Sequence, residues 1–302
     1  MNRQMRILLD VNHPAHVHLF RYAAREWERR GHKVFWTARD KDLVVDLLHH
    51  YGFDFQVLSA YRPGLVRMGW DLIARDWKLL RLVRRLRPDV MLGTSVNITH
   101  VSRFTSAQSV FFTESDPRLI RMIASLSFPF ADAIVMPDVL PDVWVNKQVK
   151  HASCHELAYL HPNHFVPDPD ILESLGVAPD EPYFILRFIA WGASHDVGES
   201  GLNLKTQRQI IETLRPHGRV FITTEADLQP EFERYRIPIA PHRMHHVLHY
   251  ARMFVGDSQS MTIEAALLGT PAIRCNSMVG RTSVIDELEM SYGLSFGFLP
   301  SQ

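Results

Sequence analysis

The sequence has few cysteines, no long hydrophobic run and no excess of charge of either sign. Its 302 residues include two cysteines, Cys154 and Cys275, which are too few for a disulfide framework. With no signal peptide at its start, this scarcity favours the reducing cytoplasm. No stretch approaches the roughly 18 consecutive apolar residues that indicate a transmembrane helix.

The balance of charges argues against nucleic acids as partners. The 33 Lys and Arg residues balance 33 Asp and Glu residues, so the formal net charge is zero and no nucleic-acid partner is expected. A composition of 46% hydrophobic and 22% charged residues is that of a folded globular protein. The unusual count is 17 histidines, whose positions decide whether they form a site.

Short apolar segments alternate with helical patterns in the first half of the chain. Residues 5–11 (MRILLDV) predict a buried strand, and an amphipathic helix follows and ends at Gly31. Further strands are predicted at 33–37, 53–58, 90–92, 109–113 and 133–136, with helices at 40–51 and 71–87. Strands that alternate with helices of about 10–15 residues indicate parallel βαβ units.

A proline-rich stretch between about residues 151 and 180 separates this pattern from a second one like it. The second pattern predicts strands at 183–188, 219–224, 253–255 and 271–275, and helices at 202–214, 244–251 and 260–268. We therefore predict an α/β protein with two Rossmann-like domains, residues 1–160 and 161–302.

The loop after the first strand is the first candidate site, because open parallel sheets bind ligands at the carboxyl ends of their strands. It lacks a G-x-G-x-x-G turn, so NAD and FAD have little support and no cofactor is expected. His13 and His16 are the candidate general bases, with Asn12 and His18 as acceptor-side contacts. Alternatively, His13 and His16 cap the helix and pack locally.

Residues 256–271 (GDSQSMTIEAALLGTP) form the strongest candidate site. A strand ends in a small polar turn and enters a helix, whose free N–H groups and positive end suit a phosphate. Glu264 shares a helix face with Ser260, and its carboxylate can accept both hydroxyls of a ribose. The candidate donor-binding residues here are Ser258, Ser260, Met261, Thr262 and Glu264. In the alternative interpretation the serines only cap the helix and Glu264 complements its dipole.

Three other strand-end loops carry candidates. In residues 187–196, Arg187 is expected to neutralise a phosphate and His195 to orient a substrate hydroxyl, unless this is a polar loop packed around Trp191. In residues 112–117, Glu114 and Asp116 are candidate acid–base carboxylates, although Asp116 before Pro117 is better explained as a helix cap. In residues 93–97, Thr94 and Asn97 are candidate acceptor contacts.

The segment GDSQSMTIEAALLGTP resembles the donor-binding segment of GT-B-fold enzymes, especially the non-hydrolysing UDP-N-acetylglucosamine 2-epimerases. The resemblance implies that Ser258 and Ser260 face a diphosphate, Glu264 a ribose and His242 a nucleobase. Gln259 and Ser260 replace two glycines of that family. The chain as a whole, with DVNHPAHVHLF, RGHKVFWTARD and RFIAWGASHDVG, resembles domain of unknown function 354, which is similar to GT-B glycosyltransferases.

This resemblance implies two domains that face across a cleft and a metal-independent transfer from a nucleotide-sugar, a UDP-sugar, to a hydroxyl acceptor in glycan biosynthesis. The rivals are an epimerase, with Glu114 and Asp116 over the sugar ring, and a non-catalytic nucleotide-sugar-binding protein. GT-B chains usually end with helices that cross back onto the first domain, and residues 272–302 leave little room for them.

The remaining patterns are weaker. His151 with His155, and His245 with His249, have the i, i+4 spacing of helical zinc ligands, but no third ligand is evident and no metal is expected. The helix at 71–87 presents either a solvated face or a contact for an anionic membrane, after a stretch at 61–70 that is a candidate holder of a lipid-linked acceptor. The basic residues of the helix at 71–87 are Arg75, Lys78, Arg81, Arg84, Arg85 and Arg87. Nothing in the sequence predicts an oligomeric state.

Overall fold

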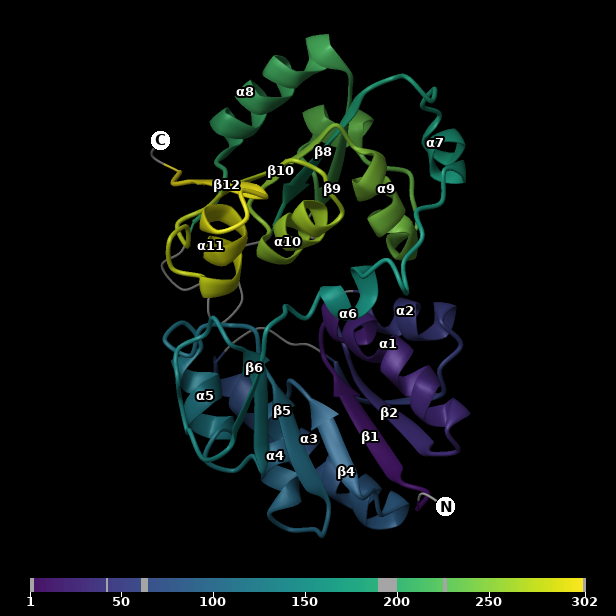
Figure 1. Ribbon diagram of the computed structural model, residues 1–302, viewed down its shortest axis with the longest axis vertical. Coiled ribbons are helices and arrows are strands. Elements are labelled where there is room, and N and C mark those ends of the chain that lie inside the picture. Colours follow the sequence, from purple (N-terminus) through teal and green to yellow (C-terminus); the bar gives the residue numbers. More distant parts are fainter. Residues whose placement is uncertain (1–2, 42, 61–64, 190–199, 225–226, 301–302) are drawn as a thin grey trace. The chain divides into compact units, whose positions relative to one another are not determined.

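The computed structural model describes residues 3–41, 43–60, 65–189, 200–224 and 227–300. They form two compact units, Met1–Tyr159 and Leu160–Gln302, each built on one sheet (Figure 1). Every pair of neighbouring strands in both sheets is parallel. The α/β fold class with two Rossmann-like units is therefore confirmed.

Unit 1 contains a 7-stranded sheet in the order β3-β2-β1-β4-β5-β6-β7. Its strands are β1 (Arg6–Val11), β2 (Lys33–Asp40), β3 (Phe55–Ala60), β4 (Val90–Gly93), β5 (Gln108–Phe112), β6 (Ala133–Pro137) and β7 (Gln148–His151). Its helices are α1 (Pro14–Arg29), α2 (Val44–His50), α3 (Leu65–Leu86), α4 (Val96–Ser102) and α5 (Arg121–Ser127), and the short α6 (Leu157–Leu160) follows them.

The start of α3 and the strand β7 differ from the prediction for unit 1. Helix α3 begins at Leu65, so residues 65–70, which were expected in a loop, are its first turns. Helix α3 includes Gly69, and a single glycine inside a helix costs only about 1 kcal/mol. The sequence analysis also missed β7, because four residues at a sheet edge are too few to give a clear alternation of polar and apolar side chains.

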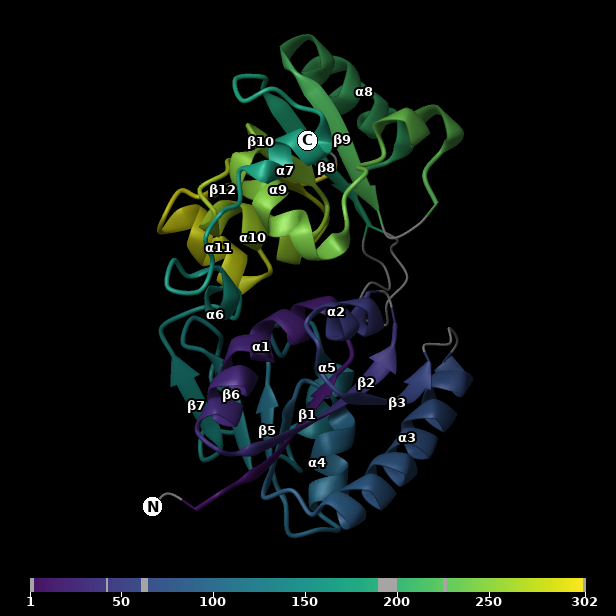
Figure 2. The same cartoon turned by 90° about the vertical axis from the view of Figure 1, so that its right-hand side faces the viewer.

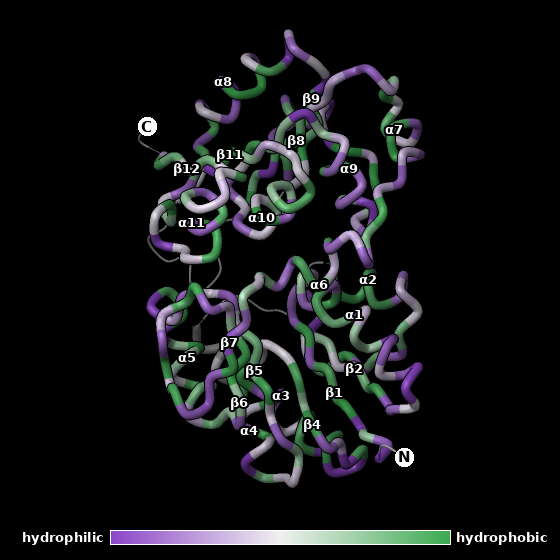
Figure 3. Tube along the Cα trace, viewed as in Figure 1, coloured by the Kyte–Doolittle hydropathy of each residue, from purple (hydrophilic) through white to green (hydrophobic). Residues whose placement is uncertain are grey.

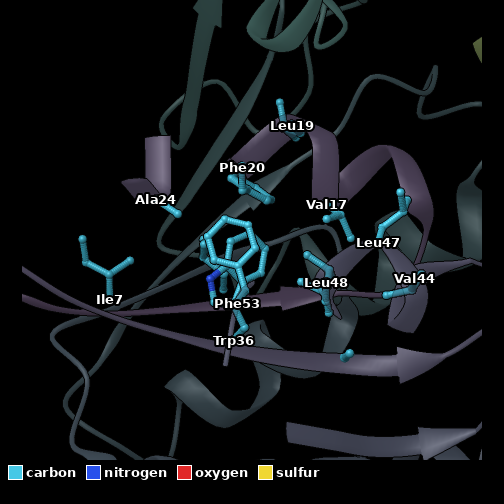
Figure 4. Packing of buried hydrophobic residues seen from close by; sticks show 13 residues of the cluster. Ile7, Val17, Leu19, Phe20, Ala24, Trp36, Val44, Leu47, Leu48 and Phe53 are labelled. Atoms are coloured by element: carbon cyan, nitrogen blue, oxygen red, sulfur yellow. The ribbon is translucent and has the colours of Figure 1, made fainter. Parts of the chain in front are cut away.

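Strand β1 is buried on both faces and organises the core of unit 1. Ile7, Leu9 and Val11 pack with apolar side chains from α1 and α2, including Val17 and Phe20 (Figure 4). Successive side chains of a strand point to opposite faces, so Leu8 packs instead with residues of α3 and α4. This double burial explains why the middle of β1 is a run of apolar residues, Ile7 to Leu9, with no polar residue between them (Figure 3).

Unit 2 contains a 5-stranded sheet in the order β12-β11-β10-β8-β9. Its strands are β8 (Tyr183–Phe188), β9 (Arg219–Thr224), β10 (Met253–Gly256), β11 (Ala272–Cys275) and β12 (Ser295–Phe298). Its α-helices are α7 (Asp170–Leu175), α8 (Leu204–Leu214), α9 (Met244–Tyr250), α10 (Gln259–Leu267) and α11 (Ser283–Met290). Residues 272–302 therefore include a helix and two strands of the sheet.

One core of unit 2 lies between the sheet and α8. Phe184, Leu186 and Phe188 of β8 pack there with Ile211 of α8 and Val255 of β10. None of the helices in the described parts of the chain is long and apolar enough to cross a membrane.

Candidate functional site

Each sheet has one place where the strand order reverses. In unit 1 it lies between β1 and β4, and in unit 2 between β8 and β10. Ligands of open α/β sheets bind outside the carboxyl ends of the strands at such switch points. The loops that follow β1, β4 and β10 are the loops that the sequence analysis selected, so the two candidate sites occupy the two switch points.

A glycine ends one of the two strands at each switch point. A Cβ atom on Gly93 would lie 2.4 Å from the carbonyl oxygen of Asp10, and one on Gly256 would lie 2.6 Å from that of Arg187. Real Cβ atoms do not approach an oxygen so closely, so any larger residue would push the paired strands apart. These glycines bring the strand-end loops of each unit close together.

In unit 1 the end of β1 is fixed by a buried ion pair. Asp10 is fully buried and accepts hydrogen bonds from Arg75 at 2.6 Å, from Thr37 at 2.7 Å and from Ser95. The expectation that Arg75 lies on a solvated or membrane-facing side of α3 was therefore wrong, since its side chain is only 3% exposed. This pair ties β1 to α3 and to the loop after β4.

At the same end of the sheet, beyond the carboxyl ends of β1 and β4, lie Asn12, His16 and Thr94. The hydroxyl of Thr94 is 2.9 Å from Nδ1 of His16 and donates to Oδ1 of Asn12 at 3.3 Å. Burial lowers the pKa of His16 well below its usual value, so its imidazole is neutral at pH 7. Nδ1 of His13 accepts from the backbone N–H of Ala15 and caps α1, which was the alternative interpretation of this residue.

The two other acceptor-side candidates lie elsewhere in unit 1. His18 is buried, and its ring centroid lies 5.2 Å from that of Tyr159. Asn97 is buried on α4, and its side-chain amide donates to Asp76 at 2.7 Å. The geometry supports a structural role for both residues and gives no support to an acceptor contact.

Glu114 follows β5 and meets the loop after β7. Its Oε1 accepts from the backbone N–H of His155 at 2.8 Å, and its Oε2 lies 3.4 Å from Nδ1 of that histidine. Burial raises the pKa of Glu114 to about 7, although hydrogen bonds from the His155 backbone and the Glu156 side chain act to lower it. A carboxylate oxygen of Glu156 lies within 4.8 Å of one of Glu114, so the two carboxyl groups are close enough to influence each other's protonation.

The histidine beside Glu114 connects it to the loop after β1. Burial lowers the pKa of His155 to about 3. Burial is also the main cause of the lowered pKa of His16, and the proximity of His13 and His155 disfavours a proton on His16 further. His151 and His155 do stack, with ring centroids 5.9 Å apart, but the expected helix face is wrong because His151 ends β7 and His155 lies in a loop.

The same cluster is the one group of metal-ligating side chains found among the described residues. Ligand atoms of Glu114, Cys154 and Glu156 all lie within 4.8 Å of one another. Burial raises the pKa of the Cys154 thiol as well as that of Glu114, so a metal ion would have to displace bound protons. That the protein uses no metal stays a prediction. Asp116 accepts from the backbone N–H of Arg118, as a capping residue does, but it caps a turn and not the expected helix, since α5 begins only at Arg121.

Unit 2 presents the start of α10 at its switch point. Ser258 is the N-cap, and its hydroxyl accepts from the backbone N–H of Met261. Thr262 is fully buried and donates to the carbonyl oxygen of Ser258 at 2.6 Å, which is a bond within the helix itself. Ser260 and Met261 are half-buried in the first turn. The hydroxyl of Ser260 and the backbone N–H groups at the start of the helix suit a phosphate best, whereas the thioether of Met261 has no hydrogen-bond donor and its N–H is bonded to Ser258.

Glu264 has a partner that the sequence analysis did not identify. Nε2 of His245 on α9 lies 3.1 Å from Oε1 of Glu264, and both side chains are less than a tenth exposed. Nδ1 of His249, one helical turn later, lies 3.1 Å from the carbonyl oxygen of Leu268. The i, i+4 spacing thus does place both histidines on one helix face, where they contact α10.

The other donor-side candidates are only partly described. Arg187 on β8 donates to the hydroxyl of Thr223 at 3.0 Å and is half-buried beside the switch point. His242 lies half-buried in a short 3-10 segment, Pro241–Arg243, just before α9. His195 and Trp191 lie outside the described residues.

The raised pKa of Glu114 predicts an effect on stability. An exposed glutamate titrates near 4.5, so between about pH 4.5 and 7 the folded chain holds a proton on Glu114 that the unfolded chain has lost. The contribution of Glu114 to the free energy of unfolding therefore falls as the pH rises through this window. The Glu114→Gln variant has no carboxyl group at this position, so it lacks this pH-dependent contribution to the free energy of unfolding.

We expect this variant to gain stability relative to the wild type as the pH rises from about 4.5 to 7, and to show a constant difference at higher pH. Urea unfolding of both proteins across this range measures the difference between their free energies of unfolding. His16 and His155 titrate in both proteins, so their contributions cancel from this difference to first order. A difference that does not change with pH would contradict the burial of an ionisable Glu114.

The family follows from comparison of the sequence with known families. The model of DUF354, described as a protein of unknown function, matches residues 5–290. The chain belongs to the DUF354 family. A transferase of Albidiferax ferrireducens is 27% identical over 221 residues, which are 68% of this chain and 51% of that protein. It is named UDP-N-acetylglucosamine–N-acetylmuramyl-(pentapeptide) pyrophosphoryl-undecaprenol N-acetylglucosamine transferase.

Solved structures confirm the fold. The UDP-GlcNAc 2-epimerase of Methanocaldococcus jannaschii superposes with a TM-score of 0.69 at 12% identity, covering 98% of this chain and 89% of that one. The spinosyn forosaminyltransferase superposes with a TM-score of 0.60 at 13% identity, covering 98% and 86%. At such identities the likeness shows the fold, and the DUF354 chain has the GT-B-like pair of Rossmann-type units that the sequence predicted.

Proposed function

We propose that this protein is a glycosyltransferase that moves a sugar from a nucleotide-sugar to a hydroxyl acceptor. The observation that carries the proposal is the start of α10 at the switch point of unit 2, with Glu264 four residues after Ser260. Backbone N–H groups of the first turn bind the diphosphate, and Glu264 accepts the ribose hydroxyls. Since a helix N-terminus and Arg187 supply positive charge, this chemistry needs no metal ion.

In unit 1, the proposed base is Glu114, whose pKa of about 7 is matched to neutral pH. Its carboxylate takes the proton of the acceptor hydroxyl, whose oxygen forms a bond to the anomeric carbon of the sugar. The bond from that carbon to the diphosphate breaks, and the leaving diphosphate is stabilised at α10. His16 stays available as a neutral imidazole, but its low pKa makes it the weaker base.

The donor class and the acceptor class rest on relatives. The transferase of Albidiferax ferrireducens and the epimerase of Methanocaldococcus jannaschii are both named for UDP-linked N-acetylglucosamine, which supports a UDP-sugar as donor. The name of that transferase includes pyrophosphoryl-undecaprenol, which supports a lipid-linked acceptor.

A thermal-shift screen of UDP-, GDP-, CMP- and dTDP-sugars tests the donor site. We expect a UDP-sugar to raise the melting temperature in proportion to the logarithm of its concentration above the Kd. If no nucleotide-sugar stabilises the protein, the assignment of α10 as the donor site is wrong.

A specific observation also favours an epimerase. Carboxylate oxygens of Glu114 and Glu156 lie within 4.8 Å of each other, and burial raises the pKa of Glu114 to about 7, which suits acid–base chemistry on a sugar ring. Incubation with UDP-N-acetylglucosamine alone separates the two functions. Conversion without an acceptor would establish the epimerase and refute simple transfer, and binding without turnover under any condition would indicate a non-catalytic sensor.

A further inference from the structure

One face of α3 exposes large apolar side chains. Trp70, Ile73 and Trp77 are 71%, 61% and 59% exposed, and their spacing of three and four residues places them in one row along the helix. The opposite face of α3 is buried in the core of unit 1 through Leu79 and Val83. Helix α3 is thus already anchored to its sheet, and the exposed row contributes nothing to that packing.

The same face becomes strongly basic toward the end of the helix. Arg81, Arg84 and Arg85 are all exposed, and the guanidinium of Arg81 lies 4.5 Å from the ring centroid of Trp77. The acidic side chains of α3 do not neutralise this face, because Asp71 pairs with Arg39 and Asp76 bonds with His100 and Asn97. Within residues 69–87 no acidic side chain is exposed.

We propose that this row of apolar and basic side chains, from Trp70 to Arg85, docks on the surface of an anionic lipid bilayer. Indole rings favour the boundary between headgroups and acyl chains, and arginines behind them favour lipid phosphates. A second copy of the chain fits less well, since the same face of a partner helix offers its arginines no exposed acidic side chain to pair with. The helix lies in the plane of the interface, with its buried face toward the protein.

The position of α3 relates this surface to the candidate site. Helix α3 packs against the edge strand β3 and begins after the carboxyl end of that strand (Figure 2). Because the sheet is parallel, this is the end at which Asn12, His16 and Thr94 lie. If the proposed function holds, the docked helix places the acceptor end of unit 1 at the lipid surface. The docking itself does not depend on that function.

Sedimentation with vesicles tests the docking without any sugar substrate. The full chain is mixed with vesicles of equal parts phosphatidylglycerol and phosphatidylcholine, or with phosphatidylcholine alone. We expect binding to the anionic vesicles that weakens with salt, and a loss of about tenfold or more in partition for Trp70→Ser/Trp77→Ser. Each of Arg81→Gln and Arg84→Gln is expected to weaken partition about fivefold.

Trp144→Ser is the matched control, because Trp144 is 52% exposed in the same unit but does not lie on α3. It should leave the partition unchanged, and the melting temperature of each variant verifies its fold. Partition that is absent, or equal for wild type and the double tryptophan variant, refutes the proposal. Light scattering that shows a dimer dissolved by the same double variant also refutes it, because the face would then join two copies of the chain.

Discussion

Replacing Glu264 by glutamine is expected to weaken the binding of the nucleotide-sugar about 50- to 100-fold. The Glu264 carboxylate is proposed to accept two ribose hydroxyls, and hydrogen bonds to a charged acceptor contribute about 1.5–3 kcal/mol each. The glutamine keeps the size of the side chain and one acceptor oxygen, so it removes the charge while retaining a bond to His245. Isothermal titration calorimetry with the UDP-sugar found in the screen measures the loss.

Two controls distinguish loss of binding from loss of structure. Glu212 is an exposed glutamate on α8 of the same unit, and Glu212→Gln should bind as the wild type does. Without ligand, Glu264→Gln should melt within a few degrees of the wild type, because its amide oxygen can still accept from Nε2 of His245. Unchanged affinity in a folded Glu264→Gln variant would show that the ribose does not contact this residue.

Local sequence patterns predicted the elements that carry the site. The apolar run of β1 and the polar turn that enters α10 both follow from side-chain periodicity and capping within a few residues. The switch points follow as well, since alternating strands and helices indicate parallel units whose loops converge at one end of each sheet. Ser258 as the N-cap and Glu264 within α10 are therefore confirmed as positions, while their ligand roles stay predictions.

The partners of these residues could not be predicted in the same way. Glu264 contacts His245, which is 19 residues earlier on another helix, and Glu114 contacts His155, which is 41 residues later in the loop after β7. Arg75 resembled its exposed basic neighbours on α3 until the fold placed it beside Asp10, 65 residues away. Such contacts depend on which helices cover which face of a sheet, and no spacing rule within one segment contains that information.

The second large effect is expected on turnover, when Glu114 is replaced or its protonation changes with pH. If Glu114 is the base, Glu114→Gln should lower kcat about 10²- to 10⁴-fold, the usual contribution of a positioned general base, and leave KM within a few-fold. The wild-type kcat should rise with pH through about 7, as the carboxyl loses its proton, and then level off. The variant should lose this rise.

The pH profile separates catalysis from structure, since a purely structural role of Glu114 would change stability without removing the rise of kcat near pH 7. Glu28→Gln, an exposed change on α1 of the same unit, should retain both rate and profile. Glu156→Gln should shift the midpoint of the rise without abolishing it, because it alters the hydrogen bond that Glu156 makes to the proposed base. If Glu114→Gln retains the wild-type rate and its pH profile, the base is another residue, and His16, held by Thr94, is then the group to replace.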